Sequence, residues 1–167
     1  MTEERKIILI AAVADNGIIG NNGGIPWEPI KEDMKRFRKL TLEHGVVMER
    51  KTFESLPERF RPLPDRLNVI LTSHPMAYAL WQSAENVYTT NSLVEAMQKA
   101  GERNADGEVY VIGGQSIYSQ TIDLADRLEI TEVHLTPDGD AYFPTIDGDF
   151  WKETWREDKG GFSFVIY

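Results

Sequence analysis

The chain contains no cysteine among its 167 residues, and this absence excludes several classes of protein at once. Disulfide-stapled scaffolds, cysteine-ligated zinc or iron–sulfur centres and thiol nucleophiles all require that residue. Any redox chemistry must therefore come from a bound cofactor rather than from the chain's own thiols, and we expect no metal site.

Long hydrophobic runs are missing as well. The apolar stretch 7–14 is too short to span a membrane, and no cleavage site of the signal-peptide type follows it. Charges of both signs precede it in residues 1–6. We therefore expect no membrane partner and no targeting segment, and we expect the protein in the cytoplasm.

Positive charge is scarce, because 18 Lys and Arg residues face 27 Asp and Glu residues and give a net charge of −9. Phosphate-backbone binding needs a basic face, so we expect no nucleic-acid partner. Residues 35–66 differ from the rest, since nine basic and five acidic side chains give this segment a net charge of +4. Such a segment could steer a small anionic ligand, although a solvated helix face would have the same composition.

What the chain does have is the length and composition of one globular α/β domain. Short runs rich in Val and Ile predict strands at 7–13, 45–48, 67–72, 87–89, 109–112 and 128–135. Helical spacing predicts helices over 30–42, 52–56, 92–100 and 115–125, and a capping box, Ser92 with Glu95, opens the third. This alternation predicts a mostly parallel sheet covered on both faces. Because no crossover helix precedes residues 162–167, we expect them to close the sheet as an antiparallel strand.

The helix predicted over 30–42 carries a carboxylate on its apolar face. Asp33 follows Ile30 by three residues and precedes Phe37 by four, so all three share one side, which Met34 also borders. A carboxylate among apolar side chains costs free energy unless it is paired. Asp33 therefore has either a structural partner or a ligand with hydrogen-bond donors, whereas we interpret Glu32 as a surface charge.

Features suited to anions follow three predicted strands. Residues 113–114 are two glycines that lead from a strand into a helix, whose first N–H groups can bind a phosphate. Residues 50–52 offer two cations and a threonine, and residues 73–74 offer a hydroxyl and a histidine. Each feature alone fits a tight turn or a surface charge, and the glycines lack the spacing of a Rossmann motif. Together they would suit a dinucleotide that carries an extra phosphate.

A long loop, residues 14–27, follows the first predicted strand and holds four glycines. Loops of this length beside a buried strand are commonly lids or binding loops. A plain surface loop is the alternative, but Trp27 beside Pro26 is poor material for one.

Short motifs spread in order over nearly the whole chain connect these features. They comprise Ile10-Ala11-Ala12, Ile18-Ile19-Gly20, Pro26-Trp27, Asp33 with Phe37 and Thr41, Arg50-Lys51-Thr52-Phe53-Glu54-Ser55, Arg61-Pro62-Leu63-Pro64 with Arg66, Val111-Ile112-Gly113-Gly114, Tyr118, Thr131, Gly139-Asp140 and Phe143-Pro144. In these motifs the chain resembles the dihydrofolate reductase family. The resemblance implies a monomer with a single domain over 1–167, an eight-stranded mixed sheet and an adenosine-binding subdomain at about 44–106.

The resemblance also implies an activity, the NADPH-dependent reduction of 7,8-dihydrofolate to 5,6,7,8-tetrahydrofolate. Hydride would pass from nicotinamide C4 to pterin C6 while N5 gains a proton. Asp33 would hold the pterin with support from Thr131, and Trp27 completes the expected catalytic set. Asp33 would tune the electronics of the substrate rather than hand over the proton itself. The loop 14–27 would close over the nicotinamide and exclude water.

Two binding sets follow from the same resemblance. The substrate set would line the pterin and benzoyl pocket and, through the last arginine, bind the glutamate carboxylate: Ile10, Ala12, Asp33, Met34, Phe37, Leu56, Thr131 and Arg66. The cofactor set would hold nicotinamide at Ala12, Ile19 and Gly20, pyrophosphate at Thr52, Gly113, Gly114, Gln115, Ser116 and Ile117, and the 2′-phosphate at Arg50, Lys51, Ser73 and His74, with Leu71, Thr72, Ile112 and Tyr118 beside them.

Glu49 departs from the family pattern, which usually has glycine between Met48 and Arg50. An acid beside the phosphate site is expected to weaken NADPH more than NADH, since only NADPH carries the 2′-phosphate. It also leaves open a noncatalytic paralogue that binds NADPH or folate. A pyrimidine reductase of the same fold is a further alternative, but it would lack the pair Trp27 and Asp33.

Overall fold

The computed structural model describes residues 4–78 and 84–167, and an eight-stranded sheet forms its centre. The strand order is β5-β4-β3-β6-β1-β7-β10-β9. The bounds are β1 (Lys6–Ala14), β3 (Gly45–Glu49), β4 (Leu67–Leu71), β5 (Val87–Thr90), β6 (Glu108–Gly113), β7 (Arg127–Val133), β9 (Trp155–Asp158) and β10 (Phe162–Ile166). The strands β5, β4, β3, β6, β1 and β7 are all parallel to their neighbours in this series. Strand β10 runs antiparallel to both β7 and β9. The predicted α/β class with a mostly parallel, mixed sheet is confirmed.

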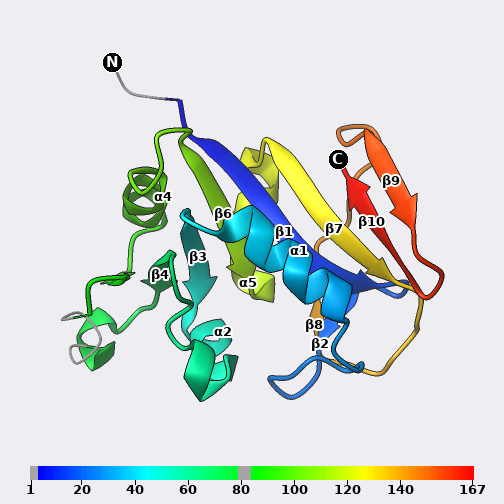
Figure 1. The fold of residues 1–167 in the computed structure, drawn as a ribbon, viewed down its shortest axis with the longest axis horizontal. Coiled ribbons are helices and arrows are strands. Elements are labelled where there is room, and N and C mark those ends of the chain that lie inside the picture. Colours follow the sequence, from blue (N-terminus) through cyan, green and yellow to red (C-terminus); the bar gives the residue numbers. More distant parts are fainter. Residues whose placement is uncertain (1–3, 79–83) are drawn as a thin grey trace.

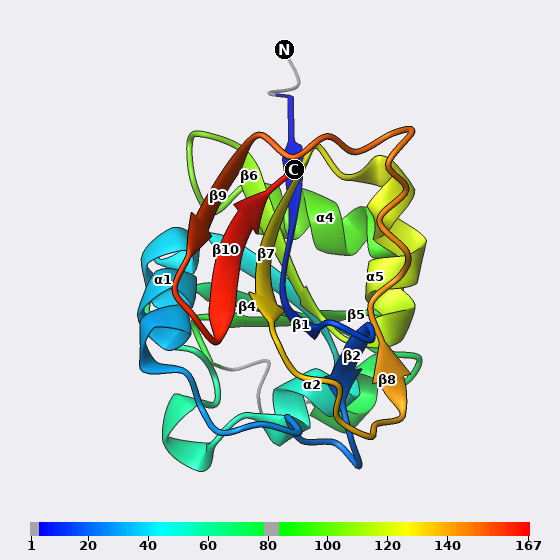
Figure 2. The ribbon, with the colours of Figure 1, turned by 90° about the vertical axis from the view of Figure 1, so that its right-hand side faces the viewer.

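Helices cover both faces of this sheet. Helix α1 (Lys31–Thr41) lies on one face, and α4 (Leu93–Gly101) and α5 (Gln115–Thr121) lie on the other, as Figures 1 and 2 show. Helix α2 (Arg50–Ser55) lies at one end of the molecule (Figure 2), and the short helices are η1 (Glu58–Phe60), η2 (Pro75–Tyr78) and η3 (Ile122–Leu124). In the described part of the chain, no helix combines the length and the apolar character that a membrane crossing needs.

The covering helices explain why the central strands have continuous apolar runs. Val46 faces the core on the α1 side, and its neighbour Val47 faces the core on the α4 side, because successive strand residues point to opposite faces. Both are completely buried. Gly45 lets α4 approach the sheet closely, since a Cβ there would lie 2.3 Å from the Ala100 carbonyl oxygen.

Two predicted elements are too long. Strand β7 ends at Val133 rather than at residue 135, because the chain turns there and the Leu135 N–H donates to the Val133 carbonyl. Helix α5 ends at Thr121 rather than at residue 125 and is followed by η3. The Thr121 hydroxyl donates to the Ile117 carbonyl four residues back, a contact that disfavours continuing the helix.

The sheet does not close where the sequence predicts. The antiparallel C-terminal strand exists as β10, but β9 lies outside it and forms the edge. The sequence pattern misses β9 because all four of its residues are exposed and show no apolar alternation. Arg156 on β9 contacts Glu132 at 2.6 Å and Glu153 at 2.7 Å. Charged side chains of this kind protect a sheet edge from pairing with another chain.

Helix α4 begins with half of the predicted capping box. The Ser92 hydroxyl accepts the Glu95 N–H at 3.2 Å. The Glu95 carboxylate does not return to Ser92 but accepts hydrogen bonds from the hydroxyls of Thr90, at 2.6 Å, and Tyr88. This acid therefore ties the helix to β5.

Candidate active site

Most of the predicted site residues lie where the parallel strands end. The carboxyl ends of β1, β3, β4, β6 and β7 share one edge of the sheet, beside α2 and the small β2 (Ile18–Gly20) and β8 (Ala141–Tyr142) pair (Figure 2). The register places Ala12 opposite Thr131 and Met48 opposite Gly113. Open α/β sheets bind ligands outside this edge.

Asp33 lies in the first turn of α1 and is bound to the sheet. Its Oδ1 accepts the Thr131 hydroxyl at 2.5 Å, across 98 residues of sequence. Burial raises the pKa of Asp33, while Thr131 and the Arg36 charge oppose that shift. Among the described residues no hydrogen bond to the second oxygen, Oδ2, is found. The predicted orientation is confirmed, because Asp33 is half-buried and Glu32 is exposed, 3.5 Å from Lys159.

A second contact holds the same helix on the same strand, and the sequence reading missed it. Arg36 donates to Glu129 at 2.5 Å, and Arg127 reaches the other oxygen of Glu129 at 3.0 Å. Asp33 and Arg36 are three residues apart on α1, and Glu129 and Thr131 are two apart on β7, so both pairs connect facing sides. The signal in the sequence is an acid, Glu129, placed between the apolar residues Leu128 and Ile130 of a strand predicted to be buried.

Apolar side chains of α1, of the residue that follows α2 and of β1 and β6 lie together on the α1 side of the sheet. Ile10, Phe37, Leu56 and Ile112 are partly buried and pack against the same core cluster, so residues predicted for substrate and cofactor adjoin. Met34 is 53% exposed and does not complete the apolar face of α1 as predicted. Only Thr41 of this helix is buried. The apolar stripe of α1 is therefore not sealed against the sheet.

Arg66 is a buried cation, only 3% exposed. Its Nε donates to the Pro64 carbonyl at 2.8 Å and its Nη1 to the Thr41 hydroxyl at 3.2 Å. Burial lowers the pKa of Arg66. Within residues 4–78 and 84–167 no carboxylate forms an ion pair with it. The completely buried Asn68, which sequence reading missed, bonds both backbone groups of Leu63 and fixes the loop that carries Arg66.

The two glycines at the end of β6, Gly113 and Gly114, form a tight junction. Gly113 has φ of +121°, a conformation that favours glycine, and a Cβ there would lie 3.3 Å from the Tyr118 hydroxyl oxygen. That hydroxyl donates to the Ile10 carbonyl at 2.7 Å and links α5 to β1. Burial raises the pKa of Tyr118, and the charge of Glu49 raises it further.

Glu49 lies somewhere other than expected. Its Oε1 accepts the Ile117 N–H at 2.8 Å, and its Oε2 lies 3.0 Å from where a Cβ on Gly114 would stand. The carboxylate thus lies at the glycine junction predicted for the pyrophosphate. It does not extend toward the cations predicted for the 2′-phosphate. The sequence identified Glu49 as unusual but could not show that a contact 68 residues away would fix it.

The groups predicted for the 2′-phosphate lie at the ends of two adjacent strands. Arg50 and Lys51 follow β3, Ser73 and His74 follow β4, and all four are exposed. The parallel register of β3 and β4 continues to Glu49 and Leu71. Thr72 is buried and its hydroxyl accepts the His74 N–H at 3.2 Å.

The loop 14–27 is anchored to a second loop. It contains β2, which pairs with β8, and the Asn22 N–H donates to Asp140 at 3.2 Å. Gly139 allows this approach, since a Cβ there would lie 2.5 Å from the Gly20 carbonyl oxygen. Trp27 is half-buried. The predicted pyrophosphate ligand Gln115 uses its side-chain oxygen to accept the Tyr142 N–H at 2.8 Å.

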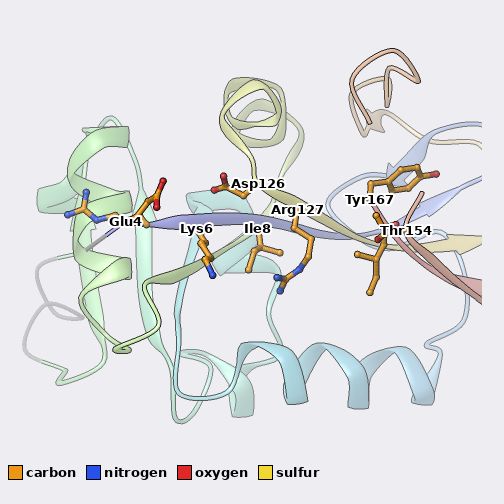
Figure 3. Close-up of a pocket in the computed structure, with 9 residues that line it drawn as sticks. Glu4, Lys6, Ile8, Asp126, Arg127, Thr154 and Tyr167 are labelled. Atoms are coloured by element: carbon orange, nitrogen blue, oxygen red, sulfur yellow. Dashed lines mark hydrogen bonds between the residues drawn. The ribbon is translucent and has the colours of Figure 1, made fainter. Parts of the chain in front are cut away.

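A hollow of about 460 Å³ lies at the opposite edge of the sheet and includes none of the predicted site residues. Figure 3 shows Lys6, Ile8 and Arg127 on the α1 side of the strands and Asp126 and Tyr167 on the other side. The hollow therefore lies at the amino ends of β1 and β7, away from the residues predicted for the site. At the strand starts His44 also contacts Asp106 at 2.8 Å and lies 3.9 Å from Glu108. Glu108 already accepts the Tyr110 hydroxyl and pairs with Arg127, so the group forms an ion-pair network.

Together the fold and the site define a class, a single-domain α/β oxidoreductase with a half-buried carboxylate and partly buried apolar side chains beside a dinucleotide-type strand edge. The family model for dihydrofolate reductase matches residues 6–162, and the chain belongs to that family.

The chain is similar to known dihydrofolate reductases over most of its own length and most of theirs. A dihydrofolate reductase of Haloferax volcanii, HdrB, is 42% identical over 97% of this chain and 82% of its own length. The dihydrofolate reductase of Mycobacterium tuberculosis is 40% identical over 95% and 94%. The solved structure of dihydrofolate reductase from Enterococcus faecalis, complexed with NADP(H) and RAB-propyl, is 29% identical and aligns with a TM-score of 0.80 over 97% of this chain and 95% of that one.

Proposed function

We infer that the chain catalyses the NADPH-dependent reduction of 7,8-dihydrofolate to 5,6,7,8-tetrahydrofolate. The observation that carries this conclusion is Asp33, a half-buried carboxylate held by Thr131 on a helix whose apolar face is only partly buried, in a member of the dihydrofolate reductase family. NADPH, when bound, supplies the hydride that reduces pterin C6. The chain's own residues bind and orient both molecules and exclude water.

On the substrate side, Asp33 accepts hydrogen bonds from the amino group and ring N–H of the pterin. Thr131 holds one carboxylate oxygen and leaves the other for these donors. Because burial raises the pKa of Asp33 and a donor-rich pterin favours its anion, the residue orients and polarises the ring. The N5 proton then comes from solvent, and the half-buried Trp27 with the loop 14–27 limits how much water enters.

The glutamate tail of the substrate carries a carboxylate, which would give Arg66 a negatively charged partner. The acceptors that the guanidinium of Arg66 finds among the described residues, on Pro64 and Thr41, are neutral, so a carboxylate ligand would stabilise this buried cation. Ile10, Phe37 and Leu56, which are partly buried against one core cluster, offer apolar surface for the pterin and benzoyl rings. Ala12 and Met34 complete the proposed substrate set.

The cofactor fits the remaining strand ends, which supply the rest of the proposed set. Ile19 and Gly20 flank the nicotinamide, and residues 44–106 form the adenosine side. The pyrophosphate lies at Thr52 and residues 113–117. The Glu49 carboxylate, which accepts a backbone N–H there, supports an oxyanion at this position. Arg50, Lys51, Ser73 and His74 take the 2′-phosphate, beside Leu71 and Thr72.

An absorbance assay of NADPH oxidation tests this function most simply. Oxidation should depend on added dihydrofolate and should not occur with a pyrimidine substrate of the riboflavin pathway. Oxidation with the pyrimidine alone would support the reductase alternative. Tight binding of both ligands without turnover would support the noncatalytic paralogue.

We also propose that the protein is a monomer, that it acts in the cytoplasm and that it binds no nucleic acid. The net charge of −9 supports the last of these, because it repels phosphate backbones. Light scattering of the purified protein would test the monomer, since a dimer would double the mass of 19.0 kDa.

A further inference from the structure

We propose that Glu49 is an intramolecular competitor for the cofactor, whose carboxylate must leave the Ile117 N–H before the pyrophosphate of NADPH or NADH can bind there. This inference rests on the proposed function. It differs from the expectation drawn from the sequence, in which Glu49 acts on the 2′-phosphate and therefore on the preference between the two cofactors.

The geometry carries the proposal. Glu49 is the last residue of β3, and its Oε1 lies 2.8 Å from the Ile117 nitrogen on α5. Its Oε2 lies against Gly114, 3.0 Å from an ideal Cβ position, and Thr52 lies 3.5 Å from that same position. Gly114, Thr52 and Ile117 are three of the groups assigned to the pyrophosphate. One carboxylate therefore occupies the space and the N–H that this part of the cofactor needs.

The charge of Glu49 adds to the steric conflict. A carboxylate beside a pyrophosphate repels it whichever nucleotide carries that pyrophosphate. NADPH and NADH share this group and differ only at the 2′-position. Removal of the carboxylate should therefore strengthen the binding of both cofactors by the same factor.

Glu49 also stabilises the free protein. An acid that accepts an N–H in the first turn of α5 satisfies a donor that would otherwise lack a partner in the helix. Without cofactor, loss of the carboxylate should lower the melting temperature. With saturating cofactor the pyrophosphate takes over the N–H, so the deficit should vanish.

The experiment is a fluorescence titration of NADPH and of NADH, without substrate, into the wild-type protein and into Glu49→Ala. Alanine is suitable because residue 49 has φ of −74° and needs no glycine. We expect Glu49→Ala to tighten both dissociation constants about tenfold, the scale of one charge-assisted hydrogen bond, with their ratio unchanged. Glu49→Gln keeps the hydrogen-bond acceptor but not the charge, so its dissociation constants should lie between those of the wild type and of Glu49→Ala. If Glu49→Ala does not fold, Glu49→Gln replaces it in the titration, and a melting curve of Glu49→Gln shows that this variant is folded.

The matched control is Glu58→Gln, which removes an equal charge from an exposed position nine residues further along. It should change neither dissociation constant by more than about twofold, the weak effect of an exposed charge. In melting curves Glu49→Gln should lose about 2–4 °C as the free protein and nothing at saturating NADPH, whereas Glu58→Gln should change neither.

Three results would overturn the proposal: affinities unchanged in Glu49→Ala, affinities weakened, or a changed NADPH/NADH ratio, which would return Glu49 to the 2′-phosphate. These results leave turnover of dihydrofolate intact and count against the role of Glu49 alone. A wild-type protein that binds neither cofactor overturns the proposed function as well.

Discussion

The half of the site that we propose for the substrate and the half that we propose for the cofactor differ in how their charged groups are held. In the substrate half, the charged groups Asp33 and Arg66 are held by neutral partners, a hydroxyl of Thr131 and the oxygens of Pro64 and Thr41. In the cofactor half, the chain's own acid, Glu49, is bound to the Ile117 N–H. On these proposed assignments, the substrate half would accept its ligand as it stands, whereas the cofactor half would first have to release a side chain.

The difference has a structural basis. Two polar contacts, Asp33 with Thr131 and Arg36 with Glu129, fix α1 on β7 before any ligand arrives. The cations assigned to the cofactor, Arg50 and Lys51, are exposed on the surface instead. Substitutions in the substrate half should therefore have large effects, and single cations of the cofactor half should have small ones.

The largest effect is expected from Asp33→Asn, which keeps the shape of the side chain and the acceptor for Thr131 but removes the anion. Turnover near pH 7 should fall about 100-fold or more, with partial recovery at acid pH where free substrate is more protonated. Steady-state NADPH oxidation measures it, with the exposed neighbour Glu32→Gln as control. Retention of half the activity by Asp33→Asn, together with loss in Glu32→Gln, would contradict the assignment.

The same variant should change how stability depends on pH. Burial raises the pKa of Asp33 above its ordinary value of 3.8, so the folded protein binds this proton more tightly than the unfolded chain. Stability therefore falls as pH rises from 3.8 through the raised pKa, and it stays reduced above that window. Asparagine does not titrate, so Asp33→Asn should be more stable than wild type at neutral pH. Urea unfolding at both ends of the window tests the sign.

The second effect is that of Arg66→Leu on ligands with a glutamate tail. Loss of one partner of a charge-assisted pair costs about 1.5–3 kcal/mol, or about 10- to 150-fold in affinity. Binding of folate and methotrexate should weaken by this factor, and binding of trimethoprim, which has no tail, should stay nearly the same. Arg59→Leu, an exposed arginine, controls for charge. Equal losses for both ligand types would show that Arg66 acts through the fold.

A smaller effect is expected from Thr131→Val, which removes the hydroxyl on Asp33. This hydrogen bond lowers the pKa of Asp33, so its loss raises that pKa further. The acid limb of the pH–rate profile should move to higher pH, and turnover near pH 7 should fall about tenfold. Thr154→Val at the opposite edge is the control. An unmoved acid limb would argue that Thr131 does not act through Asp33.

The smallest effect is that of Arg50→Gln on cofactor preference. Arg50 is exposed and 3.9 Å from Glu54, so its contribution should be that of a surface pair, about 0.5–1 kcal/mol. NADPH affinity should fall about two- to fivefold, more at low salt, while NADH affinity should hold. An equal loss for NADH would place Arg50 at the shared pyrophosphate instead.

Local patterns predicted those parts of the molecule that depend on neighbours in sequence. Helical phase was enough to orient Asp33 toward the sheet and Glu32 away from it, and alternating strand and helix signals predicted the parallel sheet. Contacts between distant segments were not accessible. The contact of Glu129 with Arg36 joins residues 93 positions apart. Asn68 and strand β9 have partners nearby in sequence, but neither shows an apolar periodicity that would have identified it. The contact of Glu49 with the Ile117 N–H could not be predicted either, because it joins residues 68 positions apart.

The most direct test of the contrast between the two halves is the amide resonance of Ile117 in nuclear magnetic resonance spectra. In the free wild-type protein this N–H donates to a carboxylate, so its resonance should shift markedly in Glu49→Gln. NADPH should bring the Ile117 resonances of the two proteins to the same position, because the same phosphate then accepts the N–H, whereas folate alone should leave them apart. Identical Ile117 resonances in the two free proteins, or convergence on folate alone, would contradict the account.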